Sequence, residues 1–363
     1  VARVLLEDGY LGMGAEVRRF EEELAAYLGV KPAQVVTTNS GTAALHLAVD
    51  AVAAGCAVKD GRPEVLVPSL TFVASFQAIS AAGCRPVACD ALPETGTLDL
   101  EDAARRLTPR TIAVMPVHYA SNPWQLEEVY AFARRHGLRV IEDAAHAFGC
   151  LRHGRKIGSF GDVVCFSFDG IKNITCGEGG CLVSFDPEVV RLASDARLLS
   201  VENDAQKRFS GTRSWDPDVK RQGWRYHMSN IMAAVGRVQL GRLDKEFAPA
   251  RRDLAALYAQ RLSPLKGLHL FATDPQDYIV PHILPVCVRE GRKDQVVRVL
   301  ADRGIPTGVH YKPNHLLSFF GGGKPSLPVT EALYSQILTV PLHPGLSRAD
   351  VEHVCDALAA ALD

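Results

Sequence analysis

Short apolar runs alternate with helix-like stretches between about residue 35 and residue 185. The runs that we expect to form strands lie at residues 65–68, 86–89, 111–117, 138–142, 163–168 and 181–185. Helices are predicted between them, over residues 41–54, 72–82, 98–107 and 124–136. Strands that alternate with helices are typical of a largely parallel sheet that is covered on both faces. We therefore predict an α/β fold whose functional groups gather at the carboxyl ends of the strands.

The chain on both sides of this unit has helical patterns. Before it, Val17, Phe20, Leu24 and Leu28 recur at helical spacing. After it, residues 229–261 have helical character over an unusual length, and Pro249 is expected to kink or break that helix. The last predicted elements are a strand at residues 279–288 and helices at residues 294–303 and 348–361. We predict a large α/β domain over residues 1–240 and a smaller α+β domain over residues 241–363.

Composition narrows the class of protein. The 363 residues include 40 basic and 41 acidic ones, with no basic block that would suit a nucleic acid or an anionic membrane. No apolar run approaches the roughly 18 residues that a transmembrane helix needs. The first ten residues contain Glu7 and Asp8 and form no apolar signal sequence, and the nine cysteines form no CxxC pair. We therefore expect a cytoplasmic protein with reduced thiols.

A first candidate site lies where a predicted helix begins. Residues 38–45 (TNSGTAAL) follow the strand-like pair Val35 and Val36. Free backbone N–H groups and the helix dipole make such a terminus a site for anions, and the Thr42 hydroxyl is a further donor. Ser and Thr are equally favoured as ordinary N-caps, so this segment alone fits both interpretations.

A second candidate is Asp143, which ends the apolar strand Val140-Ile141-Glu142. A carboxylate in that place needs a partner or solvent. It could keep a pyridine nitrogen protonated and so make the ring an electron sink. A structural cap is the alternative, and the nearby His146 equally suits a core histidine.

A third candidate is Lys172, which follows the apolar run 163–168 and precedes the glycine-rich residues 177–180. A free lysine has a pKa of roughly 10.4 and is a poor nucleophile until burial or neighbours lower it. A Schiff base would remove the need to bury an ammonium group, and glycines allow the backbone to approach a bulky ring. A lysine at an ordinary loop exit is the alternative for this segment alone.

The order of the three candidates favours one interpretation. An anion site, then a carboxylate, then a lysine 29 residues after Asp143 is the order expected for pyridoxal 5'-phosphate in an aspartate-aminotransferase-like fold. At this point the chain resembles the DegT/DnrJ family of nucleotide-sugar aminotransferases over essentially its whole length. The resemblance implies fold type I, with Lys172 as the Schiff-base residue and Asp143 as the partner of the pyridine nitrogen.

The same resemblance implies further cofactor contacts. Residues 39–45 are similar to the phosphate-contacting segment of the family, which implies contacts from Gly41, Thr42 and Ala43. Residues 68–72 (PSLTF) resemble its Pro-x-x-Thr-aromatic stretch, which implies that Phe72 stacks on the ring. The remaining implied positions are His146 near the phenolic oxygen of the ring, Ser167 on the phosphate and Arg225 in a segment that reaches the neighbouring subunit.

Two segments depart from the family pattern. Residues 225–228 read RYHM where the family often has NYRM, and Asp169-Gly170-Ile171 replaces a commoner run that contains an aromatic residue. A related branch replaces the lysine with histidine and works as a sugar dehydratase, and Lys172 argues against that branch.

The resemblance implies transamination in two half-reactions. An amino acid, in this family usually L-glutamate, would supply the amine, and a keto sugar linked to a nucleotide would receive it. Lys172 would move the proton, and a homodimer with shared active sites is implied as the smallest assembly.

Three alternatives remain from sequence alone. The acceptor could be a cyclic ketone without a nucleotide, such as a keto-inositol or a cyclohexenone. The chain could bind pyridoxal phosphate without turnover, although it has no added basic DNA-binding helix. A metal enzyme would have to use histidines that lack a ligand spacing such as HExxH, so we expect no metal; those histidines are His118, His136, His146 and His153.

Overall fold

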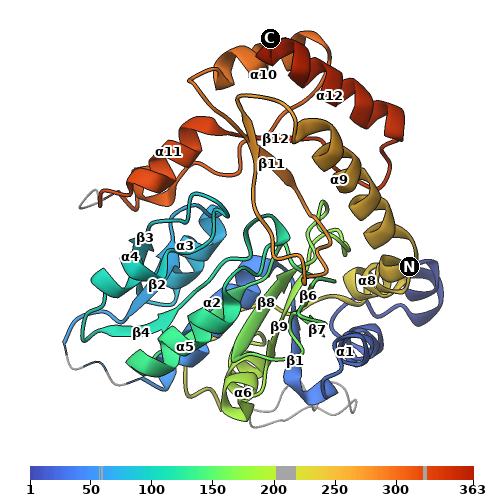
Figure 1. The fold of residues 1–363 in the computed structure, drawn as a ribbon. Coiled ribbons are helices and arrows are strands. Elements are labelled where there is room, and N and C mark those ends of the chain that lie inside the picture. The colour runs from blue at the N-terminus through green and yellow to red at the C-terminus, as the bar shows by residue number, and fades with distance from the viewer. Residues whose placement is uncertain (57, 59, 202–217, 322–324) are drawn as a thin grey trace.

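A seven-stranded mixed sheet forms the centre of the larger part of the molecule (Figure 1). The computed structural model describes residues 1–56, 58, 60–201, 218–321 and 325–363. The strand order is β1-β9-β8-β5-β4-β2-β3, and β9 is the strand that runs antiparallel to its neighbours β1 and β8. The strands are β1 (Val35–Thr38), β2 (Glu64–Pro68), β3 (Arg85–Cys89), β4 (Thr111–Val114), β5 (Arg139–Asp143), β8 (Val163–Ser167) and β9 (Gly180–Ser184).

Alternate residues of these strands are buried on opposite faces of the sheet, as the pleat requires. On β8, Val163 and Cys165 pack with α2, α3 and α6, whereas Val164 and Phe166 pack with α1 and α8. Farther along the sheet, β2 residue Leu66 joins a third cluster with α4 and α5. The helices are α1 (Ala15–Leu28), α2 (Gly41–Ala54), α3 (Val73–Ala81), α4 (Leu100–Arg105), α5 (Leu126–His136), α6 (Pro187–Ala196) and α8 (Asn230–Arg242). The predicted parallel arrangement, covered on both faces, is confirmed for all strands but β9.

A second, antiparallel sheet of three strands lies beyond one end of the first (Figure 1). Its order is β10-β11-β12, and its own apolar core includes residues of α9, α10 and α12. The elements are α9 (Ala248–Leu262), β10 (Leu268–Leu270), β11 (Leu284–Val288), α10 (Lys293–Asp302), α11 (Pro328–Gln336), β12 (Ile337–Val340) and α12 (Arg348–Leu362). This mixture of strands and helices has the predicted α+β character, and the boundary after residue 240 stays a prediction.

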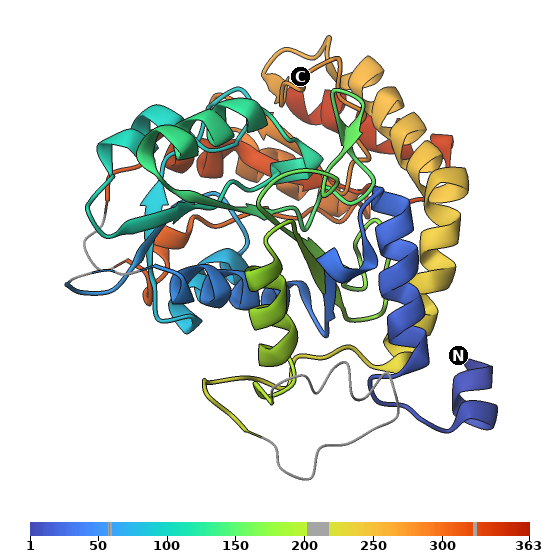
Figure 2. The ribbon, with the colours of Figure 1, turned by 90° about the horizontal axis from the view of Figure 1, so that it is seen from below.

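The long helical region between the two sheets is continuous. α8 passes through a π-helical turn, η4 (Leu243–Phe247), into α9, and Pro249 is the second residue of α9. The irregular turn therefore lies just before Pro249, because proline fits the first turn of a helix, where its missing N–H is not needed. Figure 2 shows the continuous helical region of α8, η4 and α9 beside α1, against which α8 packs.

Residues 278–282 leave the second sheet and run against the first. Tyr278 pairs with Leu151 of the small hairpin β6 (Leu151–Arg152) and β7 (Arg155–Lys156). The Val280 amide donates to Cys150 Sγ at 3.2 Å. Figure 1 shows this segment reaching down to β6 and β7 before it returns to β11. The predicted strand over residues 279–288 was therefore too long: β11 begins at Leu284, after the turn through Pro281 and His282.

The other differences from the predicted elements are small. The helix predicted over residues 98–107 is shorter, and α6, α11, β10 and the hairpin strands β6 and β7 were not predicted. The remaining short elements are η1 (Val4–Asp8), η2 (Pro32–Gln34), η3 (Tyr119–Ser121) and η5 (Asn314–Leu316). All nine cysteines are free thiols. Within the described residues, every helix is too short or too polar to cross a bilayer.

Candidate active site

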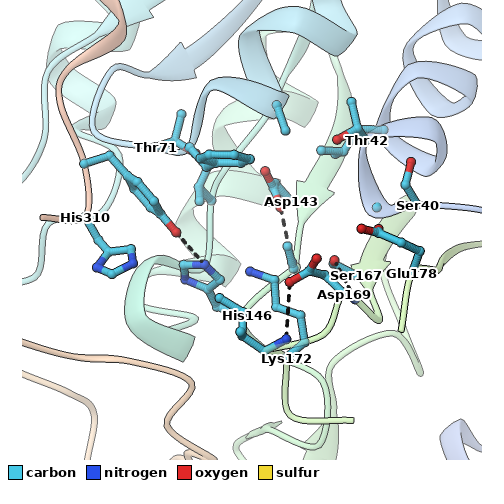
Figure 3. A pocket seen from close by; sticks show the side chains of 18 residues that line it. Ser40, Thr42, Thr71, Asp143, His146, Ser167, Asp169, Lys172, Glu178 and His310 are labelled. Atoms are coloured by element: carbon cyan, nitrogen blue, oxygen red, sulfur yellow. Dashed lines mark hydrogen bonds between the residues drawn. The ribbon is translucent and has the colours of Figure 1, made fainter. Parts of the chain in front are cut away.

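A pocket of about 270 Å³ lies where the carboxyl ends of β5 and β8 meet the N-terminus of α2 (Figure 3). The strands end at Asp143 and Ser167, and the helix begins at Gly41. The parallel strands thus bring side chains that are far apart in sequence to one edge of the sheet. Seven of the nine residues predicted for the site line this pocket: Gly41, Thr42, Phe72, Asp143, His146, Ser167 and Lys172.

The first turn of α2 forms one wall. Ser40 is the N-cap, and its Oγ accepts a hydrogen bond from the Ala43 amide at 3.1 Å. The predicted contact Ala43 does not line the pocket: its amide bonds Ser40 in this cap and the residue is buried. Ser40 and Thr42 present hydroxyl groups to the pocket beside a helix terminus that favours anions.

Three backbone segments pack closely under this wall. A Cβ atom added at Gly41 would lie 2.7 Å from Ser167 Cβ. One added at Gly180 would lie 2.7 Å from the Gly41 nitrogen and from the Phe166 oxygen. Glycine at both positions therefore lets α2 start directly against β8 and β9, which keeps Ser167 beside the helix terminus.

Asp143 is held firmly in the pocket wall. Asp143 is only 5% exposed, and its Oδ2 accepts a hydrogen bond of 2.7 Å from Ser75 Oγ. Oδ1 accepts one of 3.2 Å from the Ala145 amide. Ser75 donates its only hydroxyl hydrogen to Asp143. In the 2.9 Å hydrogen bond between the two hydroxyl groups, Thr71 Oγ1 therefore donates and Ser75 Oγ accepts. These bonds fix the carboxylate and leave it acceptor capacity for a cationic ring nitrogen.

Lys172 lies in the turn after β8, where its amide donates to the Asp169 carbonyl at 3.1 Å. Its Nζ lies 3.3 Å from Nε2 of His282. Burial lowers the pKa of Lys172 below its ordinary value, although Asp143 and Asp169 act in the opposite direction. A larger share of neutral amine makes Lys172 a better nucleophile and a better base.

Several imidazoles surround the amine. Burial and the neighbouring Lys172 hold the pKa values of His146 and His282 well below the usual range, and the pKa of His310 is lowered for the same reasons. The His146 Nε2 lies 3.0 Å from the hydroxyl of Tyr311 (Figure 3). The pocket therefore holds neutral imidazoles near neutral pH.

Two predicted residues lie toward the surface. Phe72 is 55% exposed at the pocket, with its ring centroid 5.5 Å from that of Tyr311. Arg225 is exposed and does not line the pocket within this chain. Its assignment to the site of a neighbouring subunit stays a prediction.

Sequence reasoning missed Ser75 and His282. Ser75 lies in the first turn of α3, one residue type among many that occupy such positions. His282 lies in an otherwise apolar stretch, and nothing in the local pattern connects it with Lys172. The only available signal was a polar residue in a run predicted as a strand.

The pocket fits pyridoxal phosphate. Hydroxyl groups and a helix terminus suit its phosphate, the Asp143 carboxylate suits a protonated ring nitrogen, and the Lys172 amine suits its aldehyde. Glycines at positions 41 and 180 let the helix terminus lie directly against Ser167, beside the place of the phosphate.

The four histidines considered for a metal lie in different surroundings. Among the described residues, His153 is the one of the four that belongs to a group with ligand spacing, together with Asp274 and Asp277. The Arg152 guanidinium bonds both of these carboxylates at 3.0 Å. His118 instead contacts Glu142 at 2.8 Å.

A family model and several named proteins match this sequence. Residues 1–359 match the family model of the DegT/DnrJ/EryC1/StrS aminotransferase family. A dTDP-4-dehydro-2,3,6-trideoxy-D-glucose 4-aminotransferase of Saccharopolyspora spinosa is 37% identical over 359 residues, which are 98% of this chain and 91% of that protein. The GDP-perosamine synthase of Caulobacter vibrioides is 37% identical over 366 residues, with 96% of this chain and 91% of that protein covered.

Solved structures show the same architecture. The aminotransferase TlmJ from Streptoalloteichus hindustanus superposes with a TM-score of 0.90 at 34% identity, covering 99% of this chain and 94% of that one. DesV of S. venezuelae superposes with a TM-score of 0.88 at 35% identity, covering 99% and 92%.

Proposed function

This chain belongs to the DegT/DnrJ/EryC1/StrS aminotransferase family, and from that premise we propose that it moves an amino group from L-glutamate to the keto group of a nucleotide-linked deoxy sugar. The observation that carries the proposal is the meeting of Lys172, Asp143 and the α2 terminus in one pocket. The relatives from Saccharopolyspora and Caulobacter, whose names denote enzymes of nucleotide-linked sugars, support the acceptor.

Membership confirms three predictions made from the sequence. The family resemblance is confirmed over residues 1–359, and the fold is that of type I pyridoxal phosphate enzymes. The protein is a pyridoxal phosphate-dependent aminotransferase. The residue roles, the amino donor and the sugar belong to the proposal.

Bound pyridoxal phosphate supplies an electron sink for the electrons released when a proton leaves the carbon beside the amine. Lys172 would hold it covalently through Nζ. Once displaced by the donor, the Lys172 amine would carry the proton from the α-carbon of the donor to C4′ of the cofactor. The lowered pKa of Lys172, caused by burial, increases the neutral fraction that this step needs.

Asp143 would keep the ring nitrogen protonated. Its two hydrogen bonds, from Ser75 and from the Ala145 amide, orient the carboxylate before the cofactor arrives. Such preorganisation avoids a cost of rearrangement during the reaction.

The other contacts follow from position. Gly41, Thr42 and Ser167 would hold the phosphate at the helix terminus, with Ala43 behind them in the cap. Phe72 would cover one face of the ring, and His146 would meet the phenolic oxygen. Arg225 would act in the site of the second subunit of a homodimer, which agrees with its exposure in the single chain.

The test uses the full chain with added pyridoxal phosphate. We expect a visible absorption band of the lysine-bound cofactor that L-glutamate bleaches. Borohydride reduction before digestion should fix the cofactor on Lys172, which mass spectrometry would locate. A panel of nucleotide keto sugars should then restore the band in the glutamate-treated enzyme.

Lys172→Ala is the informative variant, and Lys245→Ala, on an exposed residue of η4, is its matched control. The first should lack the band and the second should keep it. A band that no amino donor changes would contradict transamination, and a band retained by Lys172→Ala would contradict the assignment of Lys172.

A further inference from the structure

His282 contacts the amine of Lys172 although the two residues are 110 positions apart. The distance between Nε2 and Nζ is 3.3 Å, and His282 is only 4% exposed. Because Nε2 can donate or accept a hydrogen bond, this contact can hold the reacting Nζ in place by hydrogen bonding as well as by packing.

The backbone of His282 is anchored on both sides. Its amide donates to Ser121 Oγ at 2.9 Å, and its carbonyl accepts from the buried Arg251 guanidinium at 3.1 Å. The imidazole packs against His146, with ring centroids 4.5 Å apart. The ring is thus held in place without any bond to its second nitrogen.

Within the described residues, His282 Nδ1 is buried and has no hydrogen-bond partner. The partner of one ring nitrogen normally fixes which tautomer a histidine adopts. Here no bond at Nδ1 opposes the tautomer in which Nδ1 carries the proton, so Nε2 can offer its lone pair to the Lys172 amine. An ammonium group can only donate, whereas a neutral amine can also accept.

We propose that His282 is a positioning residue that stays hydrogen-bonded to Lys172 in both charge states of the amine, its Nε2 accepting from an N–H group that the ammonium and the neutral amine both carry. This inference rests on the proposed function, in which Lys172 alternates between these states.

The charges around the amine agree with this role. The groups that face Lys172 are Asp143, Asp169, His146, His282 and His310. The carboxylates raise the pKa of Lys172 while burial lowers it more strongly. Since burial also keeps the imidazoles neutral, His282 can serve as the uncharged acceptor of the ammonium.

The first test measures the contact without cofactor. Competitive labelling of amines with acetic anhydride over a range of pH, read by mass spectrometry, gives the titration midpoint of Lys172. In His282→Phe the buried ammonium loses its acceptor, so we expect the midpoint to fall by about one pH unit. His282→Gln keeps a donor and an acceptor on the side chain and should stay close to the wild type. His269→Phe in β10 controls for replacing a histidine elsewhere.

The second test uses the cofactor-loaded enzyme and the rate at which L-glutamate bleaches its band. We expect a rate about 10- to 100-fold lower in His282→Phe, because the freed amine is no longer held in place. His282→Gln should recover most of the rate. Thermal unfolding of each variant shows whether it is folded.

Two results would overturn the proposal. One is an unchanged labelling midpoint and bleaching rate in folded His282→Phe. The other is an equal defect in folded His282→Gln, since the loss would then come from shape and not from hydrogen bonding. Because the labelling needs no cofactor, absence of the band in wild type would count against the proposed function and not against this contact.

Discussion

An added methyl group at Gly41 would reach into a closely packed part of the pocket wall. The new Cβ would lie 2.7 Å from Ser167 Cβ, 3.0 Å from its Oγ and 3.1 Å from its Cα. Ordinary contacts begin at 3.4 Å, so α2 and β8 would have to separate by about 0.7 Å at this point. Ser167 ends a buried strand between β5 and β9, so its backbone cannot swing aside as a flexible side chain would.

Two opposing effects set the size of the loss. Overpacking of a closely packed region costs about 1–3 kcal/mol. Alanine is favoured over glycine within a helix by up to about 1 kcal/mol, but Gly41 is the first helical residue and gains only part of this. We therefore expect Gly41→Ala to lower the free energy of unfolding by about 1–2 kcal/mol, and to weaken cofactor binding as well.

Urea unfolding of the cofactor-free protein measures the first effect, and titration with pyridoxal phosphate measures the second. Gly55→Ala, at the other end of α2, is a matched control because its nearest new contact is an ordinary 3.6 Å. Adding Ser167→Gly to Gly41→Ala removes the closest two contacts and should restore part of the stability. If Gly41→Ala unfolds at the same urea concentration as wild type, the close packing of α2 on β8 is not a constraint and the reasoning fails.

Two further predictions concern buried charge. Arg197→Met should lower the free energy of unfolding by about 3–5 kcal/mol, because the buried Glu21, now 2.6 Å from Arg197, would lose its only cationic partner in the described residues and keep only the hydrogen bonds from Thr37. Arg242→Met, at the exposed pair with Glu246, should change urea unfolding far less, and equal losses would contradict the ranking. The cofactor-free protein should lose stability as the pH falls below 6.5, since the unfolded chain then protonates His146 and His282 while burial, which lowers their pKa values in the fold, prevents this. Each histidine contributes a slope of about 1.4 kcal/mol per pH unit, so urea unfolding of His282→Gln should show a shallower pH dependence than wild type, and an identical dependence would refute the assignment.

The site residues that could best be predicted from the sequence were charged residues at positions where burial is expected. Asp143 and Lys172 end or follow apolar strands, where a charge is costly unless it has a function or a partner. The sheet then brings them together, because the carboxyl ends of parallel strands share one edge. That argument predicted Asp143 and Lys172, the alternation of strands and helices predicted the class of fold, and the family resemblance implied most of the other lining residues.

The parts that sequence reasoning missed depend on tertiary contacts. The apolar run that predicts β9 is the same whichever way the strand runs, so its antiparallel direction could not be predicted from the sequence. The strand predicted through His282 was too long because apolar periodicity does not distinguish a strand from a buried crossing segment. The link between His282 and Lys172 spans 110 positions and has no local signature.

The crossing segment also bears on how this protein can be recombined with its relatives. Asn173, next to Lys172, donates from Nδ2 to the carbonyls of Phe148 and Val280 at 3.0 Å each, so residues 278–282 are bonded to the turn that carries the lysine. A chimera joined near residue 240 would pair one parent's lysine turn with the other parent's crossing segment. A chimera joined after His282 instead, just before β11 begins at Leu284, would keep residues 278–282 with their own turn. The position at which this chain can be exchanged with that of a relative therefore lies after His282 and not at residue 240, where the large domain is predicted to end.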